Sequence, residues 1–383
     1  MYKKTVIPFN QPTLIGTEKK YVSIAIKNNT LSGDGEFSHL CSRWLEKNLR
    51  VKKVFLTPSC TDALEMAAII LNIQKEDEII MPSYTFVSTA NAFVLRGAKI
   101  IFIDIRPDTL NIDEKLIESA ITKKTKAIVV IHYGGISCAM DTIKNISKKY
   151  KLWIIEDSAQ SILAKYKNFY LGSIGHLGCL SFHSTKNLTS GGEGGAILIN
   201  DESLIERAKI IREKGTNRSL LIEGKIDKYT WHSLGSSYLM SDLQAAYLWA
   251  QLKLSENIHI KRMKLWNNYF HSLKTSNFFD IPIFPKYCQH NAHTFYLKFK
   301  NYKDCNFFIK YMRKNGINVA QHYAPLHLSP AGIKFGKLFG NDIHTNFISK
   351  NLVRLPLFFN LDQKNQKYII CNIHKFINTY KQK

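Results

Sequence analysis

The chain has 383 residues, of which 45% are hydrophobic and 12% aromatic. This composition is typical of a folded globular protein, so we do not expect a disordered one. No apolar run reaches the ~20 residues of a membrane-spanning helix, and the first residues contain no secretion signal. The seven cysteines form no CxxC pair, which argues against a zinc site, an iron–sulfur site and a disulfide framework. We therefore expect a cytoplasmic protein without a metal and without membrane association.

The formal net charge of +23 is compatible with nucleic acid or an anionic small molecule as the partner. The lysines are dispersed along the chain, however, and do not form a basic block. This spread resembles a general bias in composition, so we expect no nucleic-acid binding. The charge stays compatible with an anionic small molecule as the substrate.

Between about residues 50 and 200, short apolar runs alternate with stretches of helical spacing. The expected strands are 77–82, 98–105, 126–133 and 151–157, and the expected helices are 62–73, 85–97, 113–121 and 140–150. This alternation predicts a mostly parallel sheet with helices on both faces.

The second half of the chain begins with a long helical pattern over residues 241–273. Further strand and helix signals follow at 293–299 and 307–316. We expect a large domain over residues 1–250 and a smaller α/β domain over residues 251–383.

Polar residues follow several of the predicted strands. Parallel sheets bind ligands beyond the carboxyl ends of their strands. Asp157 and Gln160 follow one such strand, and His132 and Tyr133 follow another. Lys186 lies in a polar turn between two apolar runs, just before a series of glycines. These side chains are therefore candidates for a shared site.

A lysine, an acidic strand end and an aromatic cluster together suit pyridoxal phosphate. This cofactor needs an amine for its aldehyde and a carboxylate for its ring nitrogen. It also needs amide donors for its phosphate, which the turn at 58–61 offers where it opens a helix.

Each of these residues also has a simpler explanation. Asp157 could cap a helix, Phe86 could lie in the core, and Thr61 could be a plain N-cap. His132 and Tyr133 could be satisfied polar groups at a strand end.

Eight stretches of the chain resemble the DegT/DnrJ/StrS-type aminotransferases, in that family's order and over nearly the whole sequence. They are "LSGDGEF", "TPSCTDAL", "MPSYTFVSTANA", "VVIHYGG", "IIEDSAQ", "SFHSTKNLTSGGEGG", "GSSYLMSDLQAA" and "HYAPLH". The resemblance implies the PLP-dependent aspartate aminotransferase fold (fold type I). In that fold a large α/β/α domain with a mixed, mostly parallel sheet precedes a smaller C-terminal α/β domain.

The resemblance also implies roles for individual residues. Lys186 would bind the aldehyde of pyridoxal phosphate covalently and then move a proton. Asp157 would pair with the ring nitrogen, Gln160 would lie near the ring hydroxyl, and Phe86 would stack on the ring. The phosphate would be held by Cys60, Thr61 and Ser181.

The partners follow from the same resemblance. Ser237 would reach the cofactor phosphate of a neighbouring subunit, which implies a homodimer with shared active sites. The substrates would be a nucleotide-linked keto-sugar and L-glutamate. The sugar would lie near His132, Tyr133, Tyr323 and His327.

Several alternatives stay open. The resemblance favours amination at C4 of a dTDP-linked sugar with a galacto product, but a gluco epimer or a 3-amino sugar would use the same chemistry. A non-catalytic regulator on the same fold is a further alternative, and only the basic charge supports it. The lysine in "HSTKN" stands where sugar dehydratases of the family have histidine, which favours transamination.

Overall fold

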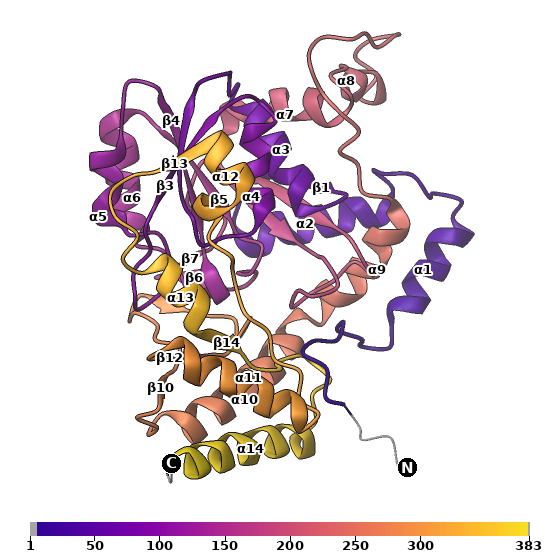
Figure 1. Ribbon diagram of the computed structural model, residues 1–383. Coiled ribbons are helices and arrows are strands. Elements are labelled where there is room, and N and C mark those ends of the chain that lie inside the picture. The colour runs from indigo at the N-terminus through magenta and orange to yellow at the C-terminus, as the bar shows by residue number, and fades with distance from the viewer. Residues whose placement is uncertain (1–5, 382–383) are drawn as a thin grey trace.

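The computed structural model describes residues 6–381, and its large domain is built on an eight-stranded sheet (Figure 1). In spatial order the strands are β1 (Lys53–Thr57), β9 (Gly195–Ile199), β8 (Leu177–Ser181), β5 (Trp153–Asp157), β4 (Thr125–Ile131), β2 (Glu78–Pro82), β3 (Lys99–Ile103) and β13 (Gly336–Leu338). From β8 to β13 each strand runs parallel to its neighbour, whereas β9 is antiparallel to both β1 and β8. The prediction of a mixed, mostly parallel sheet is confirmed.

Helices cover both faces of this sheet, because successive side chains of a strand point to opposite faces. In β4, Val129 belongs to the hydrophobic cluster on one face of the sheet, and Val130 belongs to the cluster on the other face. The first face is covered by α3 (Cys60–Ile70), α4 (Val87–Val94) and α7 (Ile205–Arg212). The second face is covered by α5 (Glu114–Ile117), α6 (Met140–Tyr150), α1 (Glu18–Lys27), α2 (Glu36–Leu49) and α9 (Asp242–Lys253). Each strand therefore ends between two helical layers, and its last residues are the ones left for a ligand.

The second domain has its own core below the large sheet (Figure 1). Its antiparallel sheet has the order β10 (Phe279–Asp280), β12 (Tyr296–Phe299) and β14 (Leu352–Arg354). The helices of this part are α10 (Ser255–Leu273), α11 (Tyr302–Lys314), α13 (Thr345–Asn351) and α14 (Gln363–Lys381). The pattern predicted over residues 241–273 thus forms two helices, α9 and α10, which meet at Leu254.

The two parts of the chain are interleaved. From the C-terminal part, α12 (Pro330–Phe335) and β13 return to the large sheet, where β13 pairs with β3. From the N-terminus, Ile7 bridges to Ile317 of the second domain. The predicted boundary between residues 250 and 251 falls inside α9 and stays a prediction.

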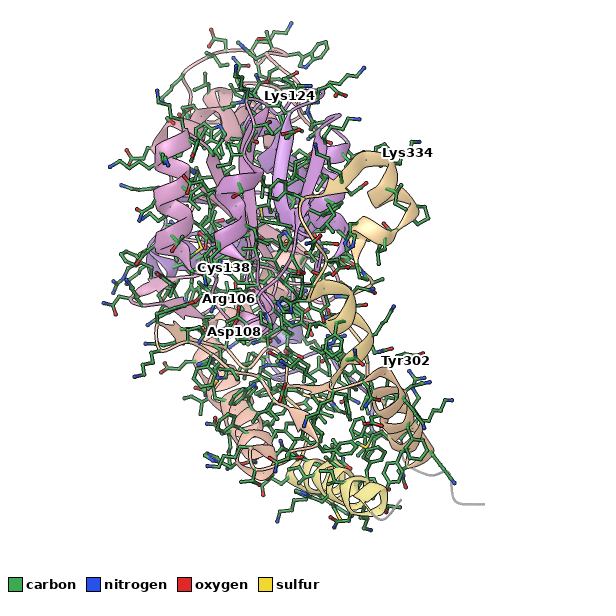
Figure 2. The ribbon with its side chains drawn as sticks, turned by 60° about the vertical axis from the view of Figure 1, so that its left-hand side comes forward. Arg106, Asp108, Lys124, Cys138, Tyr302 and Lys334 are labelled. Carbon is green, nitrogen blue, oxygen red and sulfur yellow. The ribbon has the colours of Figure 1, made fainter. Side chains whose placement is uncertain are left out.

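A third sheet, a small one, and several polar contacts join the two domains. In this sheet β11 (Cys288–Gln289) pairs with β6 (Lys165–Tyr166), which pairs with β7 (Phe169–Tyr170). Figure 2 shows Arg106 and Asp108 beside one another at the junction, where two hydrogen bonds of 2.9 and 2.7 Å join them. Lys298 of β12 donates to the Pro107 carbonyl at 3.1 Å. No helix within residues 6–381 is long and apolar enough to cross a membrane.

Candidate active site

A cavity of about 620 Å³ lies where the large sheet meets the second domain. Its large-domain wall comes from the start of α3, the segment before and within α4, and the carboxyl ends of β5 and β8. Its other wall comes from the second domain. Among the sequence-predicted residues, those that line it are Cys60, Thr61, Phe86, Asp157, Gln160, Ser181, Lys186 and Tyr323.

Lys186 lies in the turn between β8 and β9. Its amide donates to the His183 carbonyl at 2.9 Å, and Ser184 donates to the Gly192 carbonyl at 2.7 Å. Burial lowers the pKa of the Lys186 amine, and the nearby charge of Asp157 opposes this shift. The amine is therefore neutral at a lower pH than an exposed lysine, which favours reaction with an aldehyde.

The glycines after Lys186 are needed for packing. A Cβ on Gly195 would come within 2.5 Å of the Cys60 amide nitrogen. The first residue of β9 therefore lies directly against the first turn of α3. This close approach fixes the start of α3 beside the lysine turn.

The first turn of α3 presents free amide groups to the cavity. The Ser59 hydroxyl caps the helix by accepting from the Asp62 amide at 3.1 Å. The amides of Cys60 and Thr61 have no acceptor among the described residues. A helix N-terminus with free N–H groups attracts an anion such as a phosphate. Burial also raises the pKa of the Cys60 thiol, so this side chain stays protonated.

Asp157 ends β5 and is 6% exposed. Its Oδ2 accepts from the Thr89 hydroxyl at 2.7 Å, and its Oδ1 accepts from the Ala159 amide at 3.1 Å. No regular helix follows within residues 158–164, so the carboxylate is not a helix cap. It is a fixed negative charge at the cavity wall.

Gln160 links the large domain to Tyr323 of the second domain. Its Oε1 accepts from the Gly134 amide at 2.7 Å, and its Nε2 donates to the Tyr323 hydroxyl at 2.7 Å. Phe86 is 56% exposed and lies 6.5 Å from the Tyr323 ring, centroid to centroid. Such a large exposed aromatic side chain at the cavity is not a core residue.

His132 and Tyr133 do not line this cavity. Both are fully buried, and His132 Nε2 lies 2.8 Å from Glu156 Oε2. The Tyr133 ring packs among other aromatic rings, 5.2 Å from Tyr84. This placement favours the simpler explanation, satisfied polar groups at a strand end, and their contact with the sugar stays a prediction.

His327 and Ser237 also lie outside the cavity lining. His327 is held between two partners, with Nδ1 2.7 Å from the Ser83 hydroxyl and Nε2 3.0 Å from Asp342. Ser237 is exposed and bridges to Glu213 at the base of the segment that carries α8 (Arg218–Ile222). Its contact with a partner's cofactor stays a prediction.

Several residues of the cavity wall were not predicted from the sequence. His322 stacks on Tyr323 with the ring centroids 3.8 Å apart, and burial lowers its pKa to about 2. Thr89 orients the Asp157 carboxylate through its hydroxyl group. Arg354 ends β14 and is the only arginine among the described lining residues. A charged residue inside the apolar run "NLVRLPLFF" was the one signal that could have found it.

These residues fit pyridoxal phosphate. A lysine with a lowered pKa and a fixed carboxylate share one cavity with the free amides of a helix N-terminus. These are the three groups that its aldehyde, ring nitrogen and phosphate require. Lys186 would bind the aldehyde, Asp157 the ring nitrogen, and Cys60 and Thr61 the phosphate.

Comparison with known proteins identifies the family. The model of the DegT/DnrJ/EryC1/StrS aminotransferase family matches residues 12–374. GDP-perosamine synthase of Escherichia coli O157:H7 is 31% identical over 264 residues, which cover 69% of this chain and 70% of that protein. A pleiotropic regulatory protein of Geobacillus stearothermophilus is 32% identical over 317 residues, 82% of each chain.

The fold is shared with solved structures. Spr1654 from Streptococcus pneumoniae in its PLP form matches 98% of this chain and 99% of its own, with a TM-score of 0.89 and 24% identity. The prediction of the aminotransferase fold is therefore confirmed. The chain belongs to the DegT/DnrJ/EryC1/StrS aminotransferase family, and it is a PLP-dependent sugar aminotransferase.

Proposed function

We propose that this enzyme transfers the amino group of L-glutamate to C4 of dTDP-4-keto-6-deoxy-D-glucose. The products are dTDP-4-amino-4,6-dideoxy-D-galactose and 2-oxoglutarate. The observation that carries the proposal is the cavity that holds Lys186, with its lowered pKa, together with the fixed carboxylate of Asp157. The sequence motifs also resemble those of the transaminase of enterobacterial common antigen synthesis that forms this product.

The cofactor supplies an aldehyde that accepts an amine and a ring that withdraws electrons. The residues of this chain supply the rest. Lys186 Nζ would take the proton from Cα of the amino donor and pass it to the cofactor, and in the second half of the cycle it would deliver a proton to the sugar carbon that receives the amine. Asp157, held by Thr89, would place its carboxylate against the ring nitrogen.

The similarity to GDP-perosamine synthase supports an amino sugar as the product class. The choice of nucleotide, of C4 over C3 and of the galacto over the gluco product rests on the sequence resemblance. The amino sugar would then enter a bacterial surface polysaccharide, such as common antigen or the O-antigen of lipopolysaccharide.

We also propose a homodimer in which Ser237 reaches the partner's cofactor phosphate. The segment between Glu213 and Ser237 projects from the large domain at α8 (Figure 1). It exposes large apolar side chains, with Trp231 81% and Ile222 66% exposed. Exposed apolar side chains in one projecting segment favour coverage by another chain.

The seven cysteines are all free, and six of them are at least partly buried. Free thiols are typical of a reducing compartment, which supports a cytoplasmic enzyme.

Product analysis tests the substrate assignment. The enzyme would be given L-glutamate with either dTDP-4-keto-6-deoxy-D-glucose or GDP-4-keto-6-deoxy-D-mannose, and the products analysed by NMR. We expect turnover of the dTDP sugar and an axial amine at C4. An equatorial amine, a 3-amino product or faster turnover of the GDP sugar would replace the proposal with the corresponding alternative.

A further inference from the structure

The cavity wall contains a cationic side chain, that of Arg354, to which the proposed proton transfer and cofactor binding give no role. Arg354 is the last residue of β14, and its backbone is fixed on both sides. Its amide donates to the Ala320 carbonyl at 2.7 Å, and it is paired with Tyr296 of β12. Its guanidinium carbon lies 4.6 Å from the centroid of the Phe9 ring. The side chain is therefore held in place at the cavity wall by its backbone and by one aromatic ring.

The guanidinium group of Arg354 has no hydrogen-bond or ion-pair partner among residues 6–381. Its Nε atom is buried and makes no hydrogen bond, and no described carboxylate lies within ion-pair distance of the group. Buried donors are satisfied in most proteins, and an unsatisfied one calls for an explanation. A charged donor in a cavity wall with no carboxylate partner among the described residues is a candidate binding group for an anion.

A second buried arginine of the same domain shows the contrast. Arg262 of α10 is 3% exposed, and its Nε and Nη2 atoms donate to the carbonyls of Ala292, His293 and Leu357 at 3.0 to 3.2 Å. Its guanidinium group is used to hold the backbone together. Arg354 has the same chemistry but none of these bonds, so a structural role does not account for it.

The other charges of the cavity do not neutralise Arg354. Asp157 is engaged by Thr89, and Glu193 lies at the exposed side, 3.4 Å from His183. Three tyrosines, Tyr84, Tyr133 and Tyr323, interact electrostatically with Arg354, but burial raises the pKa of all three hydroxyl groups, so they are uncharged at neutral pH. The positive charge of Arg354 also contributes to the lowered pKa of Lys186. Arg354 and Lys186 line the same cavity, so both can contact one ligand.

We propose that Arg354 binds the α-carboxylate of the amino donor, an inference that rests on the proposed transamination. The donor's Cα must lie at Lys186 Nζ, and its α-carboxylate is bonded directly to that carbon. The planar guanidinium fork matches a carboxylate with two parallel hydrogen bonds. The other anion that enters this cavity is the diphosphate of the nucleotide sugar. It is attached across the sugar ring from the carbon that accepts the amino group, so it lies further from Lys186.

The test separates the two half-reactions in wild type, Arg354→Gln and the exposed control Arg313→Gln. PLP-loaded enzyme is titrated with L-glutamate, and the spectral change gives the apparent Kd. Pyridoxamine-loaded enzyme is titrated with the keto-sugar nucleotide in the same way. We expect Arg354→Gln to lower the affinity for L-glutamate by about 10- to 100-fold, because a charge-assisted pair is lost, and to change the affinity for the keto-sugar nucleotide by less than about 2-fold. Arg313→Gln should bind both ligands with the affinity of wild type.

A donor without an α-carboxylate sharpens the result. The Arg354→Gln effect should disappear with 4-aminobutanoate, which keeps the amine and the distal carboxylate only. A readout independent of turnover is calorimetry of 2-oxoglutarate binding to the PLP-loaded enzyme, with which this keto acid cannot react. Arg354→Gln should weaken this binding by the same factor as that of L-glutamate. If Arg354→Gln fails to fold, Arg354→Lys replaces it. That variant keeps the positive charge but not the planar guanidinium group, so it should bind L-glutamate more weakly than wild type and 4-aminobutanoate equally well.

Two results would overturn the proposal. An unchanged affinity for L-glutamate would exclude a role in donor binding. A loss confined to the keto-sugar nucleotide would assign Arg354 to the diphosphate instead. Failure of the proposed function is seen separately, because wild type would then not react with L-glutamate or the keto-sugar. In that case the ratio of variant to wild type, measured with whichever amino acid reacts, still decides the role of Arg354.

Discussion

Glu156 and Asp157 are neighbours at the end of β5, and their carboxylates face opposite sides of the sheet. Asp157 faces the cavity and has one side-chain partner, Thr89. Glu156 faces the interior, where it accepts from His132 Nε2 at 2.8 Å and from the backbone amides of Gly172, Ile174 and Gly175 at 2.6 to 2.8 Å. The first carboxylate is available to a ligand, and the second holds a loop.

The difference shows what a strand end does and does not determine. The end of a parallel strand brings a residue to the ligand-binding edge, but the alternation of side chains decides which face it reaches. The cavity-side residues should therefore affect the reaction, and the interior-side residues should affect stability. Substitutions on the two sides test this division.

The largest effect is expected at Lys186. Lys186→Ala should lower turnover by at least about 10³-fold, because it removes both the amine that binds the cofactor and the base that moves the proton. The yellow absorbance of the bound cofactor should be lost as well. Lys300→Ala, at an exposed position, is the control and should keep both. Turnover of Lys186→Ala at the wild-type rate would contradict the assignment.

Asp157→Asn should lower kcat by roughly 10² to 10³, since the cavity loses the fixed negative charge that faces the ring nitrogen. The fold should change little, because the amide can still accept from the Thr89 hydroxyl. Steady-state kinetics and thermal unfolding together measure the two effects. A stability loss without a rate loss would mean that Asp157 belongs with Glu156.

Glu156→Gln should give the opposite result. The substitution places an NH₂ group where a carboxylate oxygen accepts buried amides, and it should cost roughly 2–4 kcal/mol of unfolding free energy. Urea denaturation measures this loss. The folded fraction should keep a kcat within a few fold of wild type. A loss of kcat as large as that of Asp157→Asn would contradict the division between a reactive and a structural carboxylate.

The smallest effect on the reaction is expected at His290, another interior polar group. Its ring lies 4.3 Å from Trp266, and burial lowers its pKa from 6.5 to about 4. The folded state therefore binds this proton less well than the unfolded state, so stability falls as the pH drops from 6.5 towards 4. The slope should be about 1.4 kcal/mol per pH unit for this group.

His290→Gln should flatten the pH dependence of unfolding free energy by that amount between pH 6 and 4.5. Urea denaturation at several pH values checks the slope, and the difference between variant and wild type removes the contribution of the other buried histidines. An unchanged slope would show that His290 does not titrate as its burial indicates.

Much of this arrangement could be predicted from the sequence. The alternation of apolar runs and helical spacing located the parallel strands, and Asp157 and Lys186 could be recognised because each follows a strand. The strand ends alone could not separate Asp157 from His132, because this depends on which face the side chain reaches and on the partner Glu156.

The second domain's contribution was harder to predict. Arg354 and His322 reach the cavity only because the C-terminal part packs against the strand ends of the large sheet. The charge inside "NLVRLPLFF" marks Arg354 as unusual, but no local pattern encodes which distant elements it contacts. The edge strand β13 was missed for the same reason, since it pairs with β3 across more than 200 residues of sequence.

The most direct test is the spectrum of the PLP-loaded enzyme through one full cycle. L-glutamate alone should convert the yellow band to that of the pyridoxamine form, and dTDP-4-keto-6-deoxy-D-glucose should then restore it. This result would establish amino transfer through the Lys186 cavity to a nucleotide-linked keto-sugar. A colourless protein, or a band that L-glutamate leaves unchanged, would contradict the account.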